Sequence, residues 1–254
     1  MKVPPPSDVA VAAARRALAA ADVRRPSDIQ VEAIAARLGV MIVYERLTTA
    51  EALLLHAGGR AVICIDEALR GTPRAYFAIA HELGHRALHS AIDHLAQCSA
   101  AAEARTDRAW RVETEADQFA AELLMPEALC APFCTAAAPA FDDVERVARA
   151  FGTSFVASGI RYVELARAPC AITLLRWGRV AWAAESPFFP GMISARKRAH
   201  AASVAARLLD RSAGWTEGPV EVPGEAWGAR EPLVEQAVSL GRGAGVLSWV
   251  RAVE

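Results

Sequence analysis

Apolar residues along the first part of the chain recur with spacings that predict helices followed by strands. An alanine-rich stretch near the start has the period of a helix, and Val31, Ile34 and Leu38 give a second, shorter helix one apolar face. Two apolar runs then flank Gly58-Gly59, which is typical of a β-hairpin. The elements expected in order are helices over about residues 7–23 and 28–39, a strand over 40–45 and a hairpin over 52–66.

A longer helix should follow, and its start is well marked. Thr72 can cap the helix, and Pro73 stands at the first helical position, where the missing N–H of proline costs nothing. A polar insertion over about residues 90–111 separates this helix from another helical stretch, which Pro126 should stop near Met125.

The second half of the chain starts with helices and then changes character at Cys170. A segment rich in proline and alanine indicates a linker, and two helices are expected about the turn Gly152-Thr153. The elements expected are the linker over residues 131–141, helices over about 142–151 and 154–167, a hairpin about Gly178, a helix over 194–210 and strands over 233–240 and 245–252.

Composition then narrows the classes of function. A chain of 254 residues that is 54% hydrophobic can build a core, and its net charge of -1 gives no overall bias toward nucleic acid or an anionic membrane. We expect neither a signal peptide nor a membrane-spanning segment. The five cysteines lack the spacing of a disulfide framework, so free thiols in a reducing cytoplasm are expected. Cys130 and Cys134 form a lone C-x3-C and are a weak metal candidate.

The well-capped helix carries the sequence FAIAHELGHRALHS, which contains His81, Glu82 and His85. Helical residues four apart differ by about 40° in direction and about 6 Å along the axis, so both imidazoles can reach one ion. Glu82 points about 100° away from His81 and can act as a general base on water while a zinc ion polarises a carbonyl group. The spacing also occurs by chance on ordinary amphipathic helices. Its position on a capped helix after a strand, with an acidic helix downstream, favours the zinc interpretation.

The third ligand should come from a different helix. His89 lies about 12 Å along the axis from the first histidine of the motif, too far to share one ion, so it should lie beside the site or be exposed. In the sequence ETEADQF, Glu113 shares a helix face with two alanines and Asp117, and alanines allow a close helix crossing. This face predicts Glu113 as a ligand and Asp117 as the carboxylate that orients a ligating histidine. Glu115, on another face, is expected to be solvated and remains the alternative ligand.

Three motifs in this order, IQVEAIAARLGV with AVICID, then AHELGH, then ETEADQFAAELLMP, resemble the ImmA/IrrE family of zinc metallopeptidases over about residues 27–127. The resemblance implies Zn²⁺ as the cofactor, with His81, His85 and Glu113 as metal ligands and Glu82 as the general base. It also implies a protein substrate, namely a helix-turn-helix transcriptional repressor whose cleavage releases stress-response or mobile-element genes.

The fold class implied is α+β, with a small zincin-like core of the gluzincin type. We expect a zincin-like metallopeptidase domain over residues 1–136, a helix-turn-helix-like two-helix segment over 137–167 and a smaller C-terminal α+β domain over 168–254. The last part is only loosely similar to the sensor-like domain of some family members.

Several features leave alternatives open. The two-helix segment could contact DNA, but its second helix begins with Phe155, Val156 and Ala157, which are poor base or phosphate contacts, so a packing unit is favoured. The run 196–198 is basic and is expected to be a solvated helix face, with a nucleic-acid patch as the alternative. The tryptophans of the C-terminal part could form core or a ligand pocket.

Two functions of different class therefore remain. One is a zinc endopeptidase, and the other is a non-catalytic zincin-fold module that regulates, senses a ligand or binds DNA. The intact Glu82 favours the endopeptidase, because a purely structural metal site needs no base. Residues 60–66 directly precede the motif helix, and we expect them at a sheet edge where an extended substrate peptide can pair; a central strand is the alternative.

Overall fold

The computed structural model describes residues 7–48, 50–57, 60–89, 107–241 and 243–253. These residues form two compact units, and each unit combines helices with one sheet, so the α+β class is confirmed. The N-terminal unit comprises residues up to 129 together with 149–154. The C-terminal unit comprises residues 130–148 and those from 155 onward. The three-part division expected from the sequence stays a prediction.

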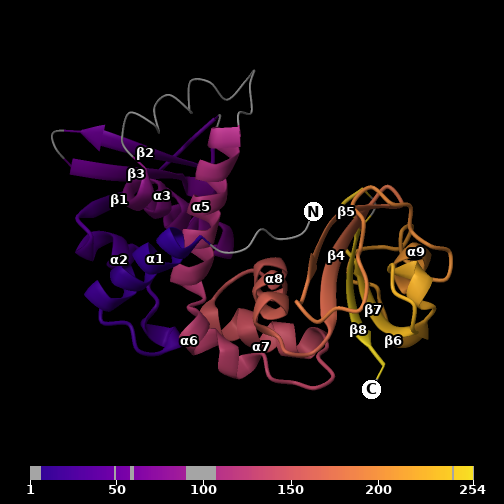
Figure 1. The fold of residues 1–254 in the computed structure, drawn as a ribbon. Helices are drawn as coiled ribbons and strands as arrows, with labels where there is room; N and C mark the ends of the chain where they lie inside the picture. Colours follow the sequence, from indigo (N-terminus) through magenta and orange to yellow (C-terminus); the bar gives the residue numbers. More distant parts are fainter. Residues whose placement is uncertain (1–6, 49, 58–59, 90–106, 242, 254) are drawn as a thin grey trace. The chain divides into compact units, whose positions relative to one another are not determined.

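The N-terminal unit places helices against a three-stranded sheet of order β1-β3-β2 (Figure 1). Strand β1 runs parallel to the central strand β3, and β2 runs antiparallel to it. The elements are α1 (Asp8–Ala20), α2 (Val31–Arg37), β1 (Val40–Glu45), β2 (Ala52–Ala57), β3 (Arg60–Asp66), α3 (Pro73–Leu88), α5 (Asp107–Leu124) and α6 (Glu127–Cys130), of which α6 ends in the other unit. The expected hairpin turn at residues 58–59 and the insertion up to 106 lie outside the described residues.

The expectation that residues 60–66 form an edge strand is wrong. Ile63 pairs with Ile42 of β1 on one side and with Leu54 of β2 on the other, so β3 is paired along both edges. Ile63, Cys64 and Ile65 are all buried, and a continuous apolar run of this kind is typical of a central strand. A substrate peptide therefore cannot add to β3.

Helices α1 and α3 hold α5 in place. Alanines on one face of α1 are buried, which lets the helix lie close to its neighbours. Arg15 of α1 pairs with the buried carboxylate of Glu122 on α5, with 2.9 Å between Nε and Oε1. The backbone N–H of Ser7 donates to the Gln118 side chain at 2.8 Å. Helix α3 begins as the sequence predicted, because Pro73 is its first residue and the Thr72 hydroxyl accepts a bond from the Ala75 N–H at 3.2 Å.

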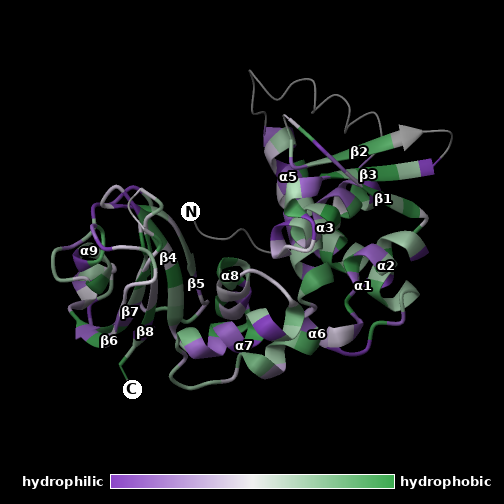
Figure 2. Cartoon of the chain, turned by 180° about the vertical axis from the view of Figure 1, so that it is seen from behind, coloured by the Kyte–Doolittle hydropathy of each residue, from purple (hydrophilic) through white to green (hydrophobic). Residues whose placement is uncertain are grey.

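The C-terminal unit is built on a five-stranded antiparallel sheet of order β5-β4-β8-β7-β6, with α8 and α9 on opposite faces (Figure 1). Its hydrophobic residues concentrate in the strands (Figure 2). The elements are α7 (Phe141–Phe151), which runs across the division between units, α8 (Phe155–Leu165), β4 (Cys170–Arg176), β5 (Arg179–Glu185), α9 (Val204–Arg207), β6 (Thr216–Val222), β7 (Leu233–Ser239) and β8 (Val246–Ala252).

Helix α8 lies against the sheet. A Cβ atom on Gly159 would come within 2.4 Å of Ile172 Cδ1 in β4, so the helix backbone approaches this side chain closely. Tyr162 is fully buried and meets Trp249 of β8 edge to face, with 5.5 Å between ring centroids. Trp249 also donates to the Pro139 carbonyl at 2.7 Å. The segment 131–141, expected to be a linker, is therefore fixed to the core of this unit.

The helix expected over residues 194–210 is mostly absent, because the backbone before Ser203 pairs with a strand instead. The Val180 N–H donates to the Lys197 carbonyl at 2.9 Å, and the Arg196 N–H donates to the Val180 carbonyl at 2.7 Å. Arg196 also has a φ of 66°, which a helix does not allow. Only the four residues of α9 are helical, after a cap in which Ser203 Oγ accepts a bond from Ala206 N–H at 3.2 Å.

The tryptophans of the C-terminal unit do not share one role. Trp227 and Trp249 are buried, whereas Trp177 and Trp215 are 82% and 50% exposed. Among the described residues, no helix is long and apolar enough to span a bilayer.

A buried carboxylate organises the centre of the C-terminal unit. Glu235 on β7 is completely buried, and burial raises the pKa of its carboxyl group. Its two oxygens accept four hydrogen bonds of 2.8–2.9 Å, from the backbone N–H groups of Val204 and Ala205, the indole of Trp227 and the hydroxyl of Ser248. Glu235 thus joins α9, the segment before β7 and strand β8.

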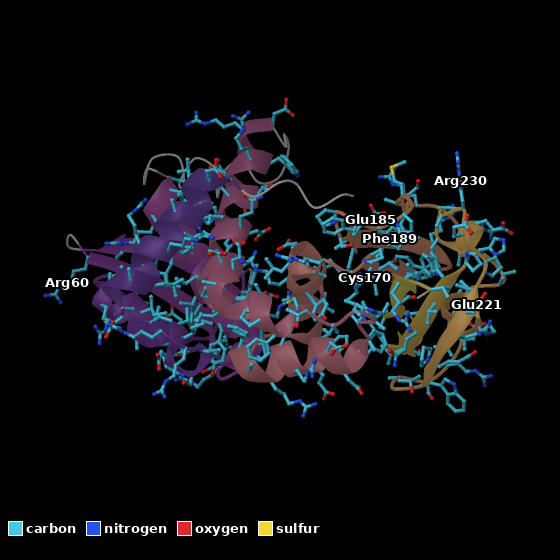
Figure 3. The ribbon with its side chains drawn as sticks, turned by 60° about the horizontal axis from the view of Figure 1, so that its bottom comes forward. Arg60, Cys170, Glu185, Phe189, Glu221 and Arg230 are labelled. Carbon is cyan, nitrogen blue, oxygen red and sulfur yellow. The ribbon has the colours of Figure 1, made fainter. Side chains whose placement is uncertain are left out.

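Glu235→Leu is expected to lower the free energy of unfolding by at least about 3 kcal/mol. Four buried donors would lose their acceptor, and each unsatisfied buried group costs about 1–3 kcal/mol. Chemical denaturation with tryptophan fluorescence measures the effect. The control is Glu221→Leu on the neighbouring strand β6, where the side chain is exposed (Figure 3). Equal destabilisation by both substitutions would contradict the role assigned to Glu235.

Candidate metal centre

The candidate site depends on how closely α5 crosses α3. A Cβ atom on Gly84 would lie 3.1 Å from both Cα and the carbonyl oxygen of Ala116, and 3.2 Å from Cβ of Phe119. The missing side chain of Gly84 thus makes room for helix α5. Because Glu113 lies one helical turn before Ala116, this crossing brings its carboxylate to the histidines of α3.

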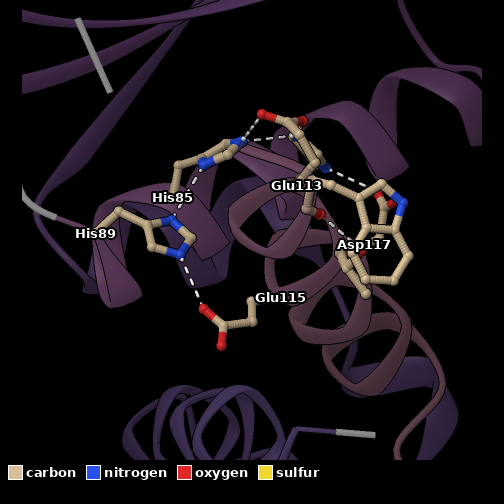
Figure 4. Close-up of polar contacts among 8 residues, drawn as sticks. His85, His89, Glu113, Glu115 and Asp117 are labelled. Atoms are coloured by element: carbon tan, nitrogen blue, oxygen red, sulfur yellow. Dashed lines mark hydrogen bonds and ion pairs between the residues drawn. The ribbon is translucent and has the colours of Figure 1, made fainter. Parts of the chain in front are cut away.

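His81, His85 and Glu113 come together as the sequence predicted. Figure 4 shows His85 and Glu113 of this cluster on neighbouring helices. The Nε2 atoms of the two histidines are 2.9 Å apart. Glu113 Oε2 lies 3.3 Å from His81 Nε2, and its Oε1 lies 3.6 Å from His85 Nε2. Zinc bonds of about 2.0–2.1 Å in a tetrahedral arrangement put neighbouring donor atoms about 3.3 Å apart. Two imidazole nitrogens and one carboxylate at these separations fit a zinc ion.

Asp117 fixes the first histidine through its other nitrogen. Its Oδ1 lies 2.9 Å from His81 Nδ1, as expected from the helix face that it shares with Glu113. Burial lowers the pKa of His81, but the hydrogen bonds to Asp117 and Glu113 outweigh burial and raise it to about 10. The bonds from His81 and His85 hold the pKa of Glu113 well below its usual range. Nδ1 of His81 is thereby committed to Asp117, and Nε2 faces the cluster.

His89 fixes the second histidine in a similar way. Its Nδ1 lies 3.2 Å from Nδ1 of His85, and its Nε2 lies 3.2 Å from Oε2 of Glu115 (Figure 4). With His85 Nε2 turned to the cluster, His85 Nδ1–H donates to His89, and His89 Nε2–H donates to Glu115. Burial lowers the pKa of His89, which favours the neutral ring that this chain of bonds requires.

The structure gives an outcome for two expectations, namely the place of His89 and the environment of Glu115. His89 lies beside the site, and its side chain is only 7% exposed. Glu115, expected to be solvated, is instead engaged by His89. The contact is hard to foresee from the residues alone, because α3 ends at Leu88 and His89 adopts an extended backbone that turns its ring back toward His85. The sequence signal for this contact was the spacing of four residues between His85 and His89.

Glu82 is buried on α3 beside the cluster, where its negative charge contributes to the raised pKa of His81. The structure therefore places a carboxylate near the metal-ligand candidates, and the role of Glu82 as a base stays a prediction.

The cysteines of the described part of the chain are separate from this site. Four of them are free and buried in the described part of the chain, namely Cys64, Cys130, Cys134 and Cys170, and Cys98 lies outside it. Cys134 donates a weak hydrogen bond to the carbonyl of Cys130 at 3.5 Å. Neither residue joins a group of three potential metal ligands among the described residues.

Comparison with known proteins identifies relatives of this arrangement. A profile of the IrrE N-terminal-like domain, which defines a peptidase family, matches residues 35–162. A solved structure of a Mycobacterium tuberculosis transcriptional regulator is similar, with a TM-score of 0.61 and 16% sequence identity over 97% of this chain and 88% of that chain. No curated protein matches the sequence. At this identity, the structural likeness concerns the fold alone.

We expect one zinc ion per chain at the cluster of His81, His85 and Glu113. His85→Ala and Glu113→Ala should lose the ion, as measured by elemental analysis of purified protein. Glu115→Ala should keep the ion with an affinity about 10–100-fold weaker in a chelator competition, because Glu115 acts through His89. If Glu113→Ala keeps zinc while Glu115→Ala loses it, the third ligand is Glu115.

Gly84→Val is expected to destabilise the protein by about 1–3 kcal/mol and to weaken zinc binding. The added side chain must push the Ala116 backbone away, and Glu113 would move with it. Ala87→Val is the control, because it places the same β-branched residue at an exposed position of the same helix. Equal unfolding midpoints and equal zinc affinities for the two variants would show that the crossing tolerates the bulk.

Proposed function

The chain belongs to the peptidase family of the IrrE N-terminal-like domain, and on this basis we propose that it is a zinc-dependent endopeptidase with a zincin-like core. The observation that carries the proposal is the cluster of His81, His85 and Glu113 beside the buried carboxylate of Glu82. A site that only stabilises a fold is closed by four protein ligands, whereas a catalytic site has three and an open position. The three candidate ligands here match the second pattern.

His81, His85 and Glu113 would hold the ion. When bound, zinc supplies a Lewis acid that polarises the peptide carbonyl group and favours attack by water. Asp117 and His89 fix the two imidazole rings so that both Nε2 atoms face one point. Glu82 accepts the proton of the attacking water and transfers it to the departing amine.

The proposed substrate is a protein partner, specifically a helix-turn-helix transcriptional repressor. Family membership supports this substrate class, and the structural neighbour named as a transcriptional regulator supports a role in gene regulation. Cleavage of one folded partner at one site would produce a switch, whereas general proteolysis would not.

Glu82→Gln should retain the fold and the zinc but lower cleavage by about 10²–10⁴-fold, because the amide cannot accept the proton. The assay mixes zinc-loaded protein with the helix-turn-helix repressor encoded nearest to its gene and follows the fragments by mass spectrometry. Glu127→Gln, at an exposed glutamate, is the matched control.

Wild-type protein should cut the repressor at one site and leave casein intact. Equal cleavage by Glu82→Gln would contradict the enzyme and favour the non-catalytic zincin-fold module. Rapid digestion of casein at many sites would contradict a single protein partner.

A further inference from the structure

Three arginines stand side by side at one end of the C-terminal sheet. Arg176 is paired directly with Arg179 across the β4–β5 hairpin, and Arg179 forms a bridge with Arg198 on its other side. Directly opposed residues of antiparallel strands project from the same face of the sheet. We call these residues the arginine row, and we propose that the arginine row and Trp177 bind single-stranded nucleic acid.

The arginine row carries unbalanced positive charge. All three side chains are exposed, and within the described part of the chain no carboxylate forms an ion pair with any of them. Like charges directly opposite each other across strands destabilise a sheet. This repulsion lowers the stability of the isolated protein, and a bound anion would relieve it. The arrangement therefore indicates an anionic partner.

Two of the three guanidinium groups are held by backbone carbonyl groups. Arg179 Nη1 donates to the Arg196 carbonyl at 2.9 Å, and Arg176 Nε donates to the Ala244 carbonyl at 3.2 Å. Each bond uses one N–H group and leaves others for a ligand. A planar guanidinium matches a phosphate in a two-point contact. With neighbouring strands about 4.8 Å apart, the backbone positions that carry the three arginines span roughly 10 Å, a length over which the side chains can follow one phosphate backbone.

Trp177 supplies an aromatic surface next to these charges. It occupies the hairpin turn between Arg176 and Arg179 and is 82% exposed. Its φ of 49° is one that asparagine or glycine adopts readily and a bulky side chain does not. Arg196, which accepts the bond from Arg179, has a φ of 66° as well. Unfavourable backbone conformations concentrate at functional sites, and exposed aromatic rings stack on unpaired bases.

These features favour nucleic acid over other polyanions. An acidic peptide would neutralise the arginines but would leave the face of Trp177 unused. A membrane surface would require apolar neighbours around the tryptophan, and here the flanking residues in the turn are Arg176, Gly178 and Arg179. The surface lies in the C-terminal unit and shares no residue with the metal centre, so it is independent of the proposed peptidase activity.

The test measures binding of a fluorescently labelled 12-nucleotide single-stranded DNA to the full chain by anisotropy at several salt concentrations. Wild-type protein should bind at low salt. Replacing all three residues of the row by alanine should weaken binding at least 10-fold and reduce the slope of log K against log salt by about 2, because each lost phosphate contact removes about 0.7 from the slope. Thermal stability should change little, because the repulsion and the hydrogen bonds of Arg176 and Arg179 are lost together.

Trp177→Asn gives a variant that cannot fail through misfolding of the turn, because asparagine suits this conformation. It should weaken binding about 10-fold and leave the salt slope unchanged. The matched control removes three exposed arginines of the N-terminal unit together, Arg16→Ala, Arg37→Ala and Arg60→Ala, and should bind as the wild type does.

The proposal is overturned if wild-type protein does not bind the oligonucleotide at low salt, or if the control triple variant loses as much affinity as the row variant. Equal displacement of the oligonucleotide by polyglutamate at the same charge concentration would assign the surface to acidic peptides. If the row variant loses binding to phosphatidylglycerol vesicles but binds the oligonucleotide as the wild type does, the surface is assigned to membranes.

Discussion

The close approach of α3 and α5 at Gly84 is the contact on which the rest of the N-terminal unit depends. The candidate metal ligands are divided between these helices, so the distance between the helix axes decides whether one ion can touch all three. Without a side chain at Gly84, the backbone of Ala116 comes close enough for Glu113 to reach both histidines. Arg15 and Glu122 hold the far side of α5 to α1, which keeps this distance fixed.

The same crossing explains why three acids of one short sequence have three roles. Glu113 faces the cluster, Asp117 holds His81 directly, and Glu115 holds His85 by way of His89. A histidine that binds a metal through Nε2 needs a partner for Nδ1, or the ring can rotate and change tautomer. Here the two rings obtain that partner by different routes, one through a single carboxylate and one through a second imidazole.

Local sequence rules predicted what depends on neighbours along the chain. Residues 40–45 form a strand with the expected bounds, Thr72 and Pro73 start α3, and the alanine face of α5 pointed to Glu113. The failures depend on distant residues. The central position of β3 is decided by which strands flank it. Residues 196–198 lie in a stretch with a helical pattern but pair with β5. Nothing near Glu235 in sequence reveals its four donors, because two of them lie about 30 residues earlier in the chain.

The path of the chain makes it difficult to separate the two units as fragments. The chain enters the C-terminal unit at residue 130, and residues 149–154 then belong to the N-terminal unit again. Phe151 and Thr153 are buried there, and the Thr153 hydroxyl donates to the sulfur of Met125 at 3.4 Å. A fragment truncated at residue 129 would therefore expose the surface that these side chains cover. The boundary between the units is not a single point on the chain. An excised N-terminal unit would need the returning segment supplied separately, as in a complementation of two fragments.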